Sequence, residues 1–395
     1  MDGESANIDQ QTNHSNNSID QQRIMSYTKI NHYEKEYIDA HHESALNVTQ
    51  GVEDQPIVNP HFVRRKKRVL STEEYVNGIL KGDITVLSRA ITLIESSNPD
   101  HYAQAQEIIE RCLPHAGKSV RIGITGVPGA GKSTFIEAIG NMVTSLRHKL
   151  AVLAIDPSSE RSGGSILGDK TRMESLTTNR DVFIRPSPSA GSLGGVARKT
   201  RETIILCEAA GFDVIFIETV GVGQSETAVH SMVDLFMMLQ ISGAGDELQG
   251  IKRGIMEMAD MMVITKADGE NVHKAELAKT QYQGALRLFP VPESQWRPKV
   301  YTCSSVNRTG LEEVWKGVED FLDFVQTNGY FAHNRNRQNK YWMYETINEA
   351  LKNSFYQNPL IEGRIEEMEQ KVLADKISSF VAAHELLDLY FNNKQ

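Results

Sequence analysis

The residues with the most specific chemistry in this sequence lie between Gly126 and Ser133, which read GVPGAGKS. This spacing fits a phosphate-binding P-loop. Its glycines allow the backbone to turn tightly, so that several N–H groups point into one concavity. Lys132 supplies a positive charge for the outer phosphates, and the Ser133 hydroxyl can bind Mg²⁺. The predicted phosphate-binding residues are Gly126, Pro128, Gly129, Ala130, Gly131, Lys132, Ser133 and Thr134.

Two further segments carry carboxylates that could bind a metal ion. In the first, Glu218 ends an apolar stretch and is followed by Thr-Val-Gly221. A carboxylate in this place reaches Mg²⁺, usually through water, and the Gly221 N–H can contact a terminal phosphate. A polar, glycine-rich segment carries Asp156 and Asp169, and paired carboxylates beside a P-loop suit a hard cation. The predicted metal ligands are Ser133, Asp156, Asp169 and Glu218.

A guanine-binding loop is indicated by Thr265-Lys-Ala-Asp268. The Asp268 carboxylate can accept both the ring N–H and the exocyclic amine of guanine, and adenine presents no such pair of donors. The stem of Lys266 can pack over the base. Ser304 and Ser305 follow the last apolar run, where backbone N–H groups can meet the guanine carbonyl. The order of these motifs is that of a G domain, so we expect GTP and GDP as ligands, with Mg²⁺.

The elements that must position these residues alternate along the chain. Seven apolar runs are expected to be strands, over residues 120–125, 151–155, 182–185, 213–218, 235–240, 261–265 and 299–303. Several are near-continuous in apolar residues, as in parallel strands that are covered on both faces. Helical patterns fall between most of them. The sequence therefore predicts an α/β fold with a mostly parallel sheet flanked by helices.

Four regions are expected along the chain. Residues 1–70 are polar and lack any helical or strand period, which predicts a disordered tail. Residues 71–118 carry apolar residues at helical spacing and should form an N-terminal helical module. The G domain is expected over 119–328. Residues 329–395 read as an apolar helical extension that either packs on the core or makes a dimer.

Composition narrows the class of protein. The chain has 395 residues, 40% of them hydrophobic, and a formal net charge of −9, which argues against a nucleic-acid partner. No apolar run approaches the ~18 residues of a membrane span. Three widely spaced cysteines fit a reducing compartment, and the tail has neither a secretory signal nor a mitochondrial presequence. A cytoplasmic location is expected.

The longer motifs resemble those of the MeaB/ArgK family of P-loop GTPases. The resemblance runs from about Ser71 to Leu389 and rests on GITGVPGAGKST, AIDPSSERSGGSILGDKTRM, GGVARKTRE, FIETVGVGQSE, GAGDELQGIKRG and ITKADG. It implies a P-loop NTPase of the SIMIBI/G3E type that hydrolyses GTP slowly and forms homodimers. It also implies a chaperone role toward adenosylcobalamin-dependent methylmalonyl-CoA mutase, in cofactor loading and protection.

The resemblance also implies residue roles. The segment Gly243–Lys252 resembles an additional switch loop that senses nucleotide and mutase. The residues that would act in hydrolysis are Lys132, Glu218, Asp246 and Lys252. One departure is Thr265, where the family usually has asparagine; a hydroxyl remains, but the reach of the amide is lost. Val222 stands where Ras-type GTPases have a water-orienting glutamine, which by itself predicts slow hydrolysis.

Two other functions stay open at this point. A GTP-dependent metallochaperone for nickel or cobalt would need a Cys/His cluster, and the one pair of adjacent histidines in the sequence, His41-His42, lies in the tail without a cysteine beside it. An ATPase or kinase linked to lysine, arginine and ornithine transport would prefer ATP, which Asp268 opposes. For Glu218 and Asp268 the structural alternative is a strand-end carboxylate that caps a turn.

Overall fold

The computed structural model describes residues 70–96, 98–155, 173–187, 193–219, 225–243 and 253–392. Its centre is a seven-stranded parallel sheet with the order β3-β2-β4-β1-β5-β6-β7. The strands are β1 (Val120–Gly126), β2 (Leu150–Ile155), β3 (Val182–Ser187), β4 (Val214–Thr219), β5 (Leu235–Ile241), β6 (Met261–Thr265) and β7 (Lys299–Thr302). All seven expected strands are confirmed, with ends that agree to within two residues.

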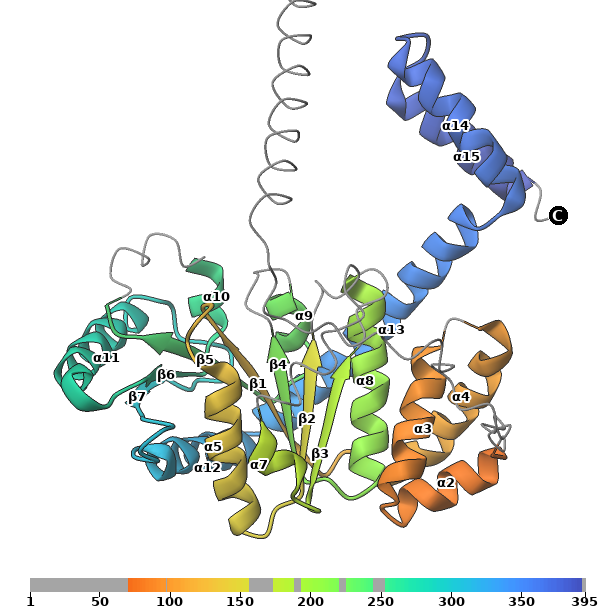
Figure 1. Cartoon of the computed structure of the whole chain (residues 1–395). Helices are drawn as coiled ribbons and strands as arrows, with labels where there is room; N and C mark the ends of the chain where they lie inside the picture. Colours follow the sequence, from red (N-terminus) through yellow and green to blue (C-terminus); the bar gives the residue numbers. More distant parts are fainter. Residues whose placement is uncertain are drawn as a thin grey trace, which may run out of the picture. The chain divides into compact units, whose positions relative to one another are not determined.

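Helices cover both faces of the sheet (Figure 1). A short helix, η1 (Leu113–His115), precedes β1. The helices between and after the strands are α5 (Lys132–Ser145), α7 (Glu174–Thr177), α8 (Leu193–Ala209), α9 (Ser225–His230), α10 (Arg253–Met258), η4 (Gly269–Asn271), α11 (Val272–Leu286) and α12 (Leu311–Thr327). Phe135 of α5 and Phe321 of α12 pack with Phe216 on one face. Ile204 of α8 packs with Phe236 on the other. This two-sided burial explains why the central strands are apolar at nearly every position.

The N-terminal helical module is confirmed as α2 (Thr72–Leu80), α3 (Ile84–Glu95) and α4 (Pro99–Cys112). Each helix begins at a side-chain cap, supplied by Ser71, Asp83 and Asn98. The three helices share one apolar cluster with α8. At the end of α3, Glu95 forms an ion pair with Arg185 of β3, so the module is attached to the sheet by both packing and charge.

The C-terminal helices are α13 (Tyr330–Tyr356), α14 (Pro359–Leu373) and α15 (Ser379–Asn392). The first half of α13 packs against the α/β domain. There, Trp342 Nε1 donates to the carbonyl of Ser231, just after α9, at 3.1 Å. In the described ranges no helix has the length and apolar character that crossing a membrane requires. The domain boundaries expected from the sequence stay predictions.

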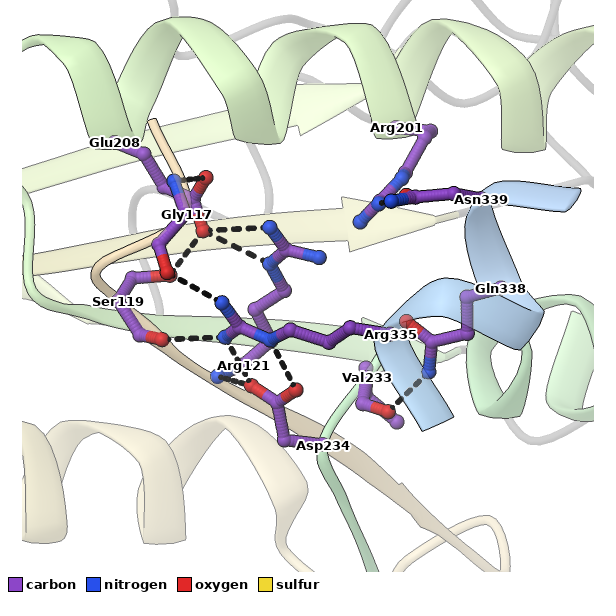
Figure 2. A network of polar contacts seen from close by, with 10 residues as sticks. All are labelled: Gly117, Ser119, Arg121, Arg201, Glu208, Val233, Asp234, Arg335, Gln338 and Asn339. Atoms are coloured by element: carbon purple, nitrogen blue, oxygen red, sulfur yellow. Dashed lines mark hydrogen bonds and ion pairs between the residues drawn. The ribbon is translucent and has the colours of Figure 1, made fainter. Parts of the chain in front are cut away.

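A buried ionic network lies at the amino-terminal ends of the strands (Figure 2). Arg335 of α13 makes two hydrogen bonds to the Asp234 carboxylate, at 2.8 and 2.7 Å. Arg121 of β1 donates from Nε to Glu208 of α8 at 2.8 Å. The guanidinium of Arg335 also donates to the carbonyls of Gly117 and Ser119. The network therefore ties α13 to the strand that leads into the P-loop.

Candidate functional site

The P-loop begins where β1 ends, at the carboxyl edge of the sheet. β1 lies between β4 and β5. In open α/β sheets, ligands bind beside the carboxyl ends of the strands, at the point where the strand order changes direction. Gly126 has no room for a side chain, because a Cβ there would lie 2.5 Å from the Leu239 carbonyl oxygen. Gly129 and Gly131 have φ angles of 79° and 77°, which residues with a Cβ rarely adopt. The loop therefore has the backbone geometry that a phosphate cradle requires.

Lys132 begins α5 and folds back over the loop. Its Nζ donates to the carbonyls of Gly126 at 3.0 Å and Val127 at 3.4 Å. Burial lowers the pKa of Lys132, while the charges of Glu218 and Glu226 oppose this effect. A partly buried ammonium held by neutral carbonyls is well placed to exchange them for phosphate oxygens.

Two of the predicted metal ligands meet at this edge. Ser133 Oγ donates to Glu218 Oε1 at 3.4 Å. Next to them, Thr219 Oγ1 donates to Thr125 Oγ1 at 2.9 Å, which joins the ends of β4 and β1. A hydroxyl and a carboxylate in contact form an oxygen donor set, as Mg²⁺ prefers, so the residues present fit this ion.

The loop at Thr265 is joined directly to the P-loop. Thr265 is 2% exposed, and its Oγ1 lies 2.7 Å from the Ala130 carbonyl and 3.0 Å from that of Gln240. The stem of Lys266 reaches the P-loop as well, because a Cβ on Gly131 would lie 3.9 Å from Lys266 Cε. Threonine thus supplies a link between the two loops by itself, without an asparagine amide.

The predicted base-binding residues also come together. Ser304 Oγ donates to Asp268 Oδ2 at 2.5 Å, and the Ala267 N–H donates to the carbonyl of Cys303 at 3.0 Å. The backbone N–H of Ser304 donates to the Thr309 carbonyl at 3.0 Å. Of the two serines, Ser305 is therefore the better candidate for donating to a guanine carbonyl.

Glu226 is a neighbour of this site that the sequence reasoning did not single out. It is 2% exposed, in the first turn of α9, and its charge acts to raise the pKa of Lys132. The residue stands within the FIETVGVGQSE motif. Its motif position was visible in the sequence, but its burial and closeness to Lys132 required the fold.

Some of the remaining predicted residues are described by the structure and the others are not. Among the described ones, Ala130 is fully buried, whereas Pro128 in the loop and Thr134 at the start of α5 are exposed. Outside the described residues lie Asp156, Asp169, Gly221, Val222, Asp246 and Lys252. Among the residues that are described, no three His, Cys, Asp or Glu side chains gather closely enough to hold a metal ion.

Curated relatives cover most of this chain. A probable GTPase of Mycobacterium tuberculosis is 49% identical over 308 residues, which are 78% of this chain and 92% of that protein. GTPase ArgK of Escherichia coli is 45% identical over 285 residues, 72% of this chain and 86% of the relative. The mouse protein named methylmalonic aciduria type A homolog, mitochondrial, is 46% identical over 323 residues, 79% of this chain and 78% of its own.

A solved structure and a family model agree with these relatives. A crystal structure titled LAO/AO transport system kinase superposes with a TM-score of 0.66 at 34% identity, and covers 82% of this chain and 99% of its own. The model for methylmalonyl-CoA mutase-associated GTPase MeaB matches residues 87–360. The resemblance inferred from the sequence motifs and the P-loop fold are therefore confirmed: this chain belongs to the MeaB family of GTPases.

Proposed function

We propose that this protein binds GTP, hydrolyses it slowly, and uses this cycle as a chaperone for an adenosylcobalamin-dependent acyl-CoA mutase. The observation that carries the nucleotide part is the meeting of three motifs at one sheet edge. The P-loop, the Ser133–Glu218 pair and the Thr265–Asp268 loop are joined by direct hydrogen bonds. The mutase part is supported by the family name, mutase-associated GTPase.

The phosphate end of the site supplies charge and donors. Lys132 would exchange its two carbonyl partners for phosphate oxygens, and the loop N–H groups would surround the β-phosphate. Ser133 and Glu218, with Asp156 and Asp169 proposed beside them, would hold Mg²⁺. Bound Mg²⁺ would neutralise charge on the terminal phosphates.

The base end supplies selectivity. Asp268, oriented by Ser304, would accept the ring N–H and the exocyclic amine of guanine. The N–H of Ser305 would donate to the guanine carbonyl. An adenine base would not supply these two donors, which costs affinity because two hydrogen bonds to the Asp268 carboxylate are not made.

Hydrolysis is proposed to depend on a partner. Val222 cannot orient water, so the intrinsic rate should resemble the ~10⁻⁴–10⁻³ s⁻¹ of resting Ras-type enzymes. Asp246 and Lys252, in the glycine-rich segment from Gly243, are proposed to complete the site when the mutase binds. Supplying a missing charged group in this way is worth ~10³–10⁵ in rate in known cases.

A homodimer is proposed through the C-terminal helices. An apolar pocket of about 760 Å³ lies between the end of α13, α14 and α15, with Phe355, Met368 and Leu386 in its lining. Nearby, Phe380 is 79% exposed and Leu373 is 78% exposed. Exposed apolar surface of this kind is typical of protein–protein contacts, and a second copy would cover it.

Nucleotide titration tests the first part of the proposal. Calorimetry should give far tighter binding of GTP and GDP than of ATP. Asp268→Asn removes one acceptor and should shift the preference toward xanthine nucleotides. Equal affinity of the parent for ATP and GTP would overturn the assignment.

Phosphate release with and without the host's own mutase tests the second part. The mutase should raise the turnover number at least about tenfold, well within the range of known activators. Lys252→Ala should remove most of that gain while GDP affinity stays nearly unchanged. A parent that is already fast alone, or full stimulation of Lys252→Ala, would remove this loop from the mechanism.

A transport-linked kinase is the second candidate, since the structural relative carries that title. It predicts ATP preference, so the same titration separates the two functions. The cytoplasmic location also stays a proposal, because the mouse relative is named mitochondrial.

A further inference from the structure

One asparagine amide joins the base-binding loop to the end of β5. Asn271 Nδ2 donates to the Lys266 carbonyl at 2.7 Å. Ser242 Oγ donates to Asn271 Oδ1 at 2.6 Å. A carbonyl can only accept, so Nδ2 must be the atom that faces Lys266, and the amide has one orientation. Both polar atoms of the side chain are therefore used, one toward each loop.

The hydrogen bond from Asn271 to the Lys266 carbonyl lies at a strained point of the backbone. Lys266 has a φ of 55°, a left-handed conformation that costs energy in a residue with a Cβ and persists only where its surroundings hold it. The Asn271 amide holds the carbonyl of that same residue, and the Asn271 N–H donates to the Asp268 carbonyl at 2.9 Å. Only Ala267 separates Lys266 from Asp268, so the direction of the Asp268 side chain depends on this turn.

The second partner of the Asn271 amide, Ser242, lies next to the proposed switch segment. Ser242 directly follows β5 and precedes Gly243, the first residue of the segment proposed to respond to the partner. The Asn271 side chain thus contacts both the base-binding loop and Ser242, the residue that directly precedes that segment.

We infer that Asn271 is a positioning residue for guanine selectivity, which acts through the Lys266 carbonyl without touching the nucleotide. The inference rests on the proposed GTP-binding function. It predicts that the amide donor of Asn271 affects which base is bound, and that the Ser242 hydroxyl has a smaller effect of the same kind.

The decisive variant is Asn271→Asp. It keeps the size of the side chain and an acceptor for Ser242, but it places an oxygen against the Lys266 carbonyl. Asn271→Ala removes both bonds, and Ser242→Ala removes only the bond from Ser242. Asn179→Ala is the matched control, because Asn179 also makes two side-chain bonds, to Thr144 and Asp181, at the opposite edge of the sheet.

Calorimetry with GDP, IDP and ADP gives the readout. Inosine lacks the exocyclic amine, so the ratio of GDP to IDP affinity reports how well Asp268 is placed. GDP affinity should fall about tenfold in Asn271→Asp and Asn271→Ala, and about threefold in Ser242→Ala, the range of one lost hydrogen bond. The GDP/IDP ratio should fall in the same order, and Asn179→Ala should match the parent.

Three results would count against the inference. Parent-like GDP affinity and GDP/IDP ratio in Asn271→Asp would overturn it and leave the proposed function standing. An equal loss for GDP and IDP would reduce Asn271 to a structural role. A parent that binds ADP as well as GDP would instead overturn the proposed function. Thermal unfolding checks each fold, and Asn271→Ala carries the same test if Asn271→Asp does not fold.

Discussion

The two edges of the sheet hold charged groups in opposite ways. At the amino edge, the Glu208 and Asp234 side chains are each 1% exposed and are paired with Arg121 and Arg335 (Figure 2). At the carboxyl edge, the hydrogen-bond partners of Lys132 within the described part of the chain are backbone carbonyls. The amino edge pairs buried carboxylates with arginines, whereas Lys132 at the carboxyl edge is held by neutral carbonyls that a phosphate could replace.

The pKa values follow this division. Burial lowers the pKa of Lys132, and the nearby carboxylates do not fully compensate. Burial is also the largest influence on the pKa of Arg335 and acts to lower it, but the hydrogen bonds to Asp234 together with the negative charges of Asp234 and Glu208 outweigh burial and raise this pKa overall. Burial of a charged group therefore does not by itself identify a functional site. What distinguishes Lys132 from Arg335 is that the hydrogen-bond partners of Lys132 among the described residues are neutral carbonyls and not a carboxylate.

The largest expected effect is on catalysis at the carboxyl edge. Lys132→Ala removes a charge-assisted contact to the transferring phosphate and should lower kcat/KM for GTP by about 10³-fold. Its melting temperature should stay close to that of the parent, since its partners are carbonyls at a loop. A phosphate-release assay measures the rate, with exposed Lys316→Ala as the control. A large loss of stability in Lys132→Ala would contradict the division between edges.

The amino edge should show the reverse pattern. Asp234→Ala leaves Arg335 buried without its carboxylate, and breaking a buried ion pair costs about 3–5 kcal/mol. Urea unfolding measures this loss, and the GDP affinity of the folded fraction should be nearly unchanged. The exposed pair of Arg364 and Glu367 gives the control, since Glu367→Ala should not change stability measurably. Parent-like stability of Asp234→Ala would mean that the network does not hold α13.

Asp260 tests whether the kind of partner decides the pKa of a buried group. It is a buried carboxyl at the amino edge, and the cause that lowers its pKa is a hydrogen bond from the backbone and not an arginine. It accepts the Phe236 N–H at 2.8 Å, and burial raises its pKa from 3.8 to about 7. The native state then binds more protons than the unfolded state between these values, so stability falls as pH rises. Between pH 5 and pH 8 the loss should be about 2–3 kcal/mol.

Asp260→Asn keeps an acceptor for Phe236 and cannot ionise. Urea unfolding across that pH range should therefore show a flatter stability profile for the variant than for the parent. Two profiles with the same slope would show that Asp260 does not titrate in this window.

The smallest expected effect concerns Thr265. Thr265→Ala removes the hydroxyl that joins the base-binding loop to the Ala130 carbonyl. One net hydrogen bond is worth about 1 kcal/mol, so GDP affinity should fall about fivefold by calorimetry. Thr265→Ser keeps the hydroxyl and should bind as the parent does; a loss in both variants would implicate the methyl group instead.

Much of the fold could be predicted because parallel strands buried on both faces are apolar throughout, and P-loop chemistry is local in sequence. The Ser133–Glu218 contact followed from motif order. The Arg335–Asp234 pair joins residues 101 positions apart, and no local pattern indicates it. The same holds for Asn271, whose role depends on the left-handed turn at Lys266, and for Glu226, whose burial depends on how α9 packs.

The attachment of α13 by Arg335 has a mechanical consequence. A helix of 27 residues is about 40 Å long at the usual rise per residue. Arg335 is not the only attachment, because Gln338 donates to the Val233 carbonyl and Trp342 donates to that of Ser231. Further along, Glu349 pairs with Arg198 of α8 at 3.7 Å. The helix is therefore held over roughly 30 Å of its length, and only about 10 Å extends beyond the last of these contacts. A shift of the strand that carries the P-loop would move α13 as one rigid rod, and would not tilt it about a single point.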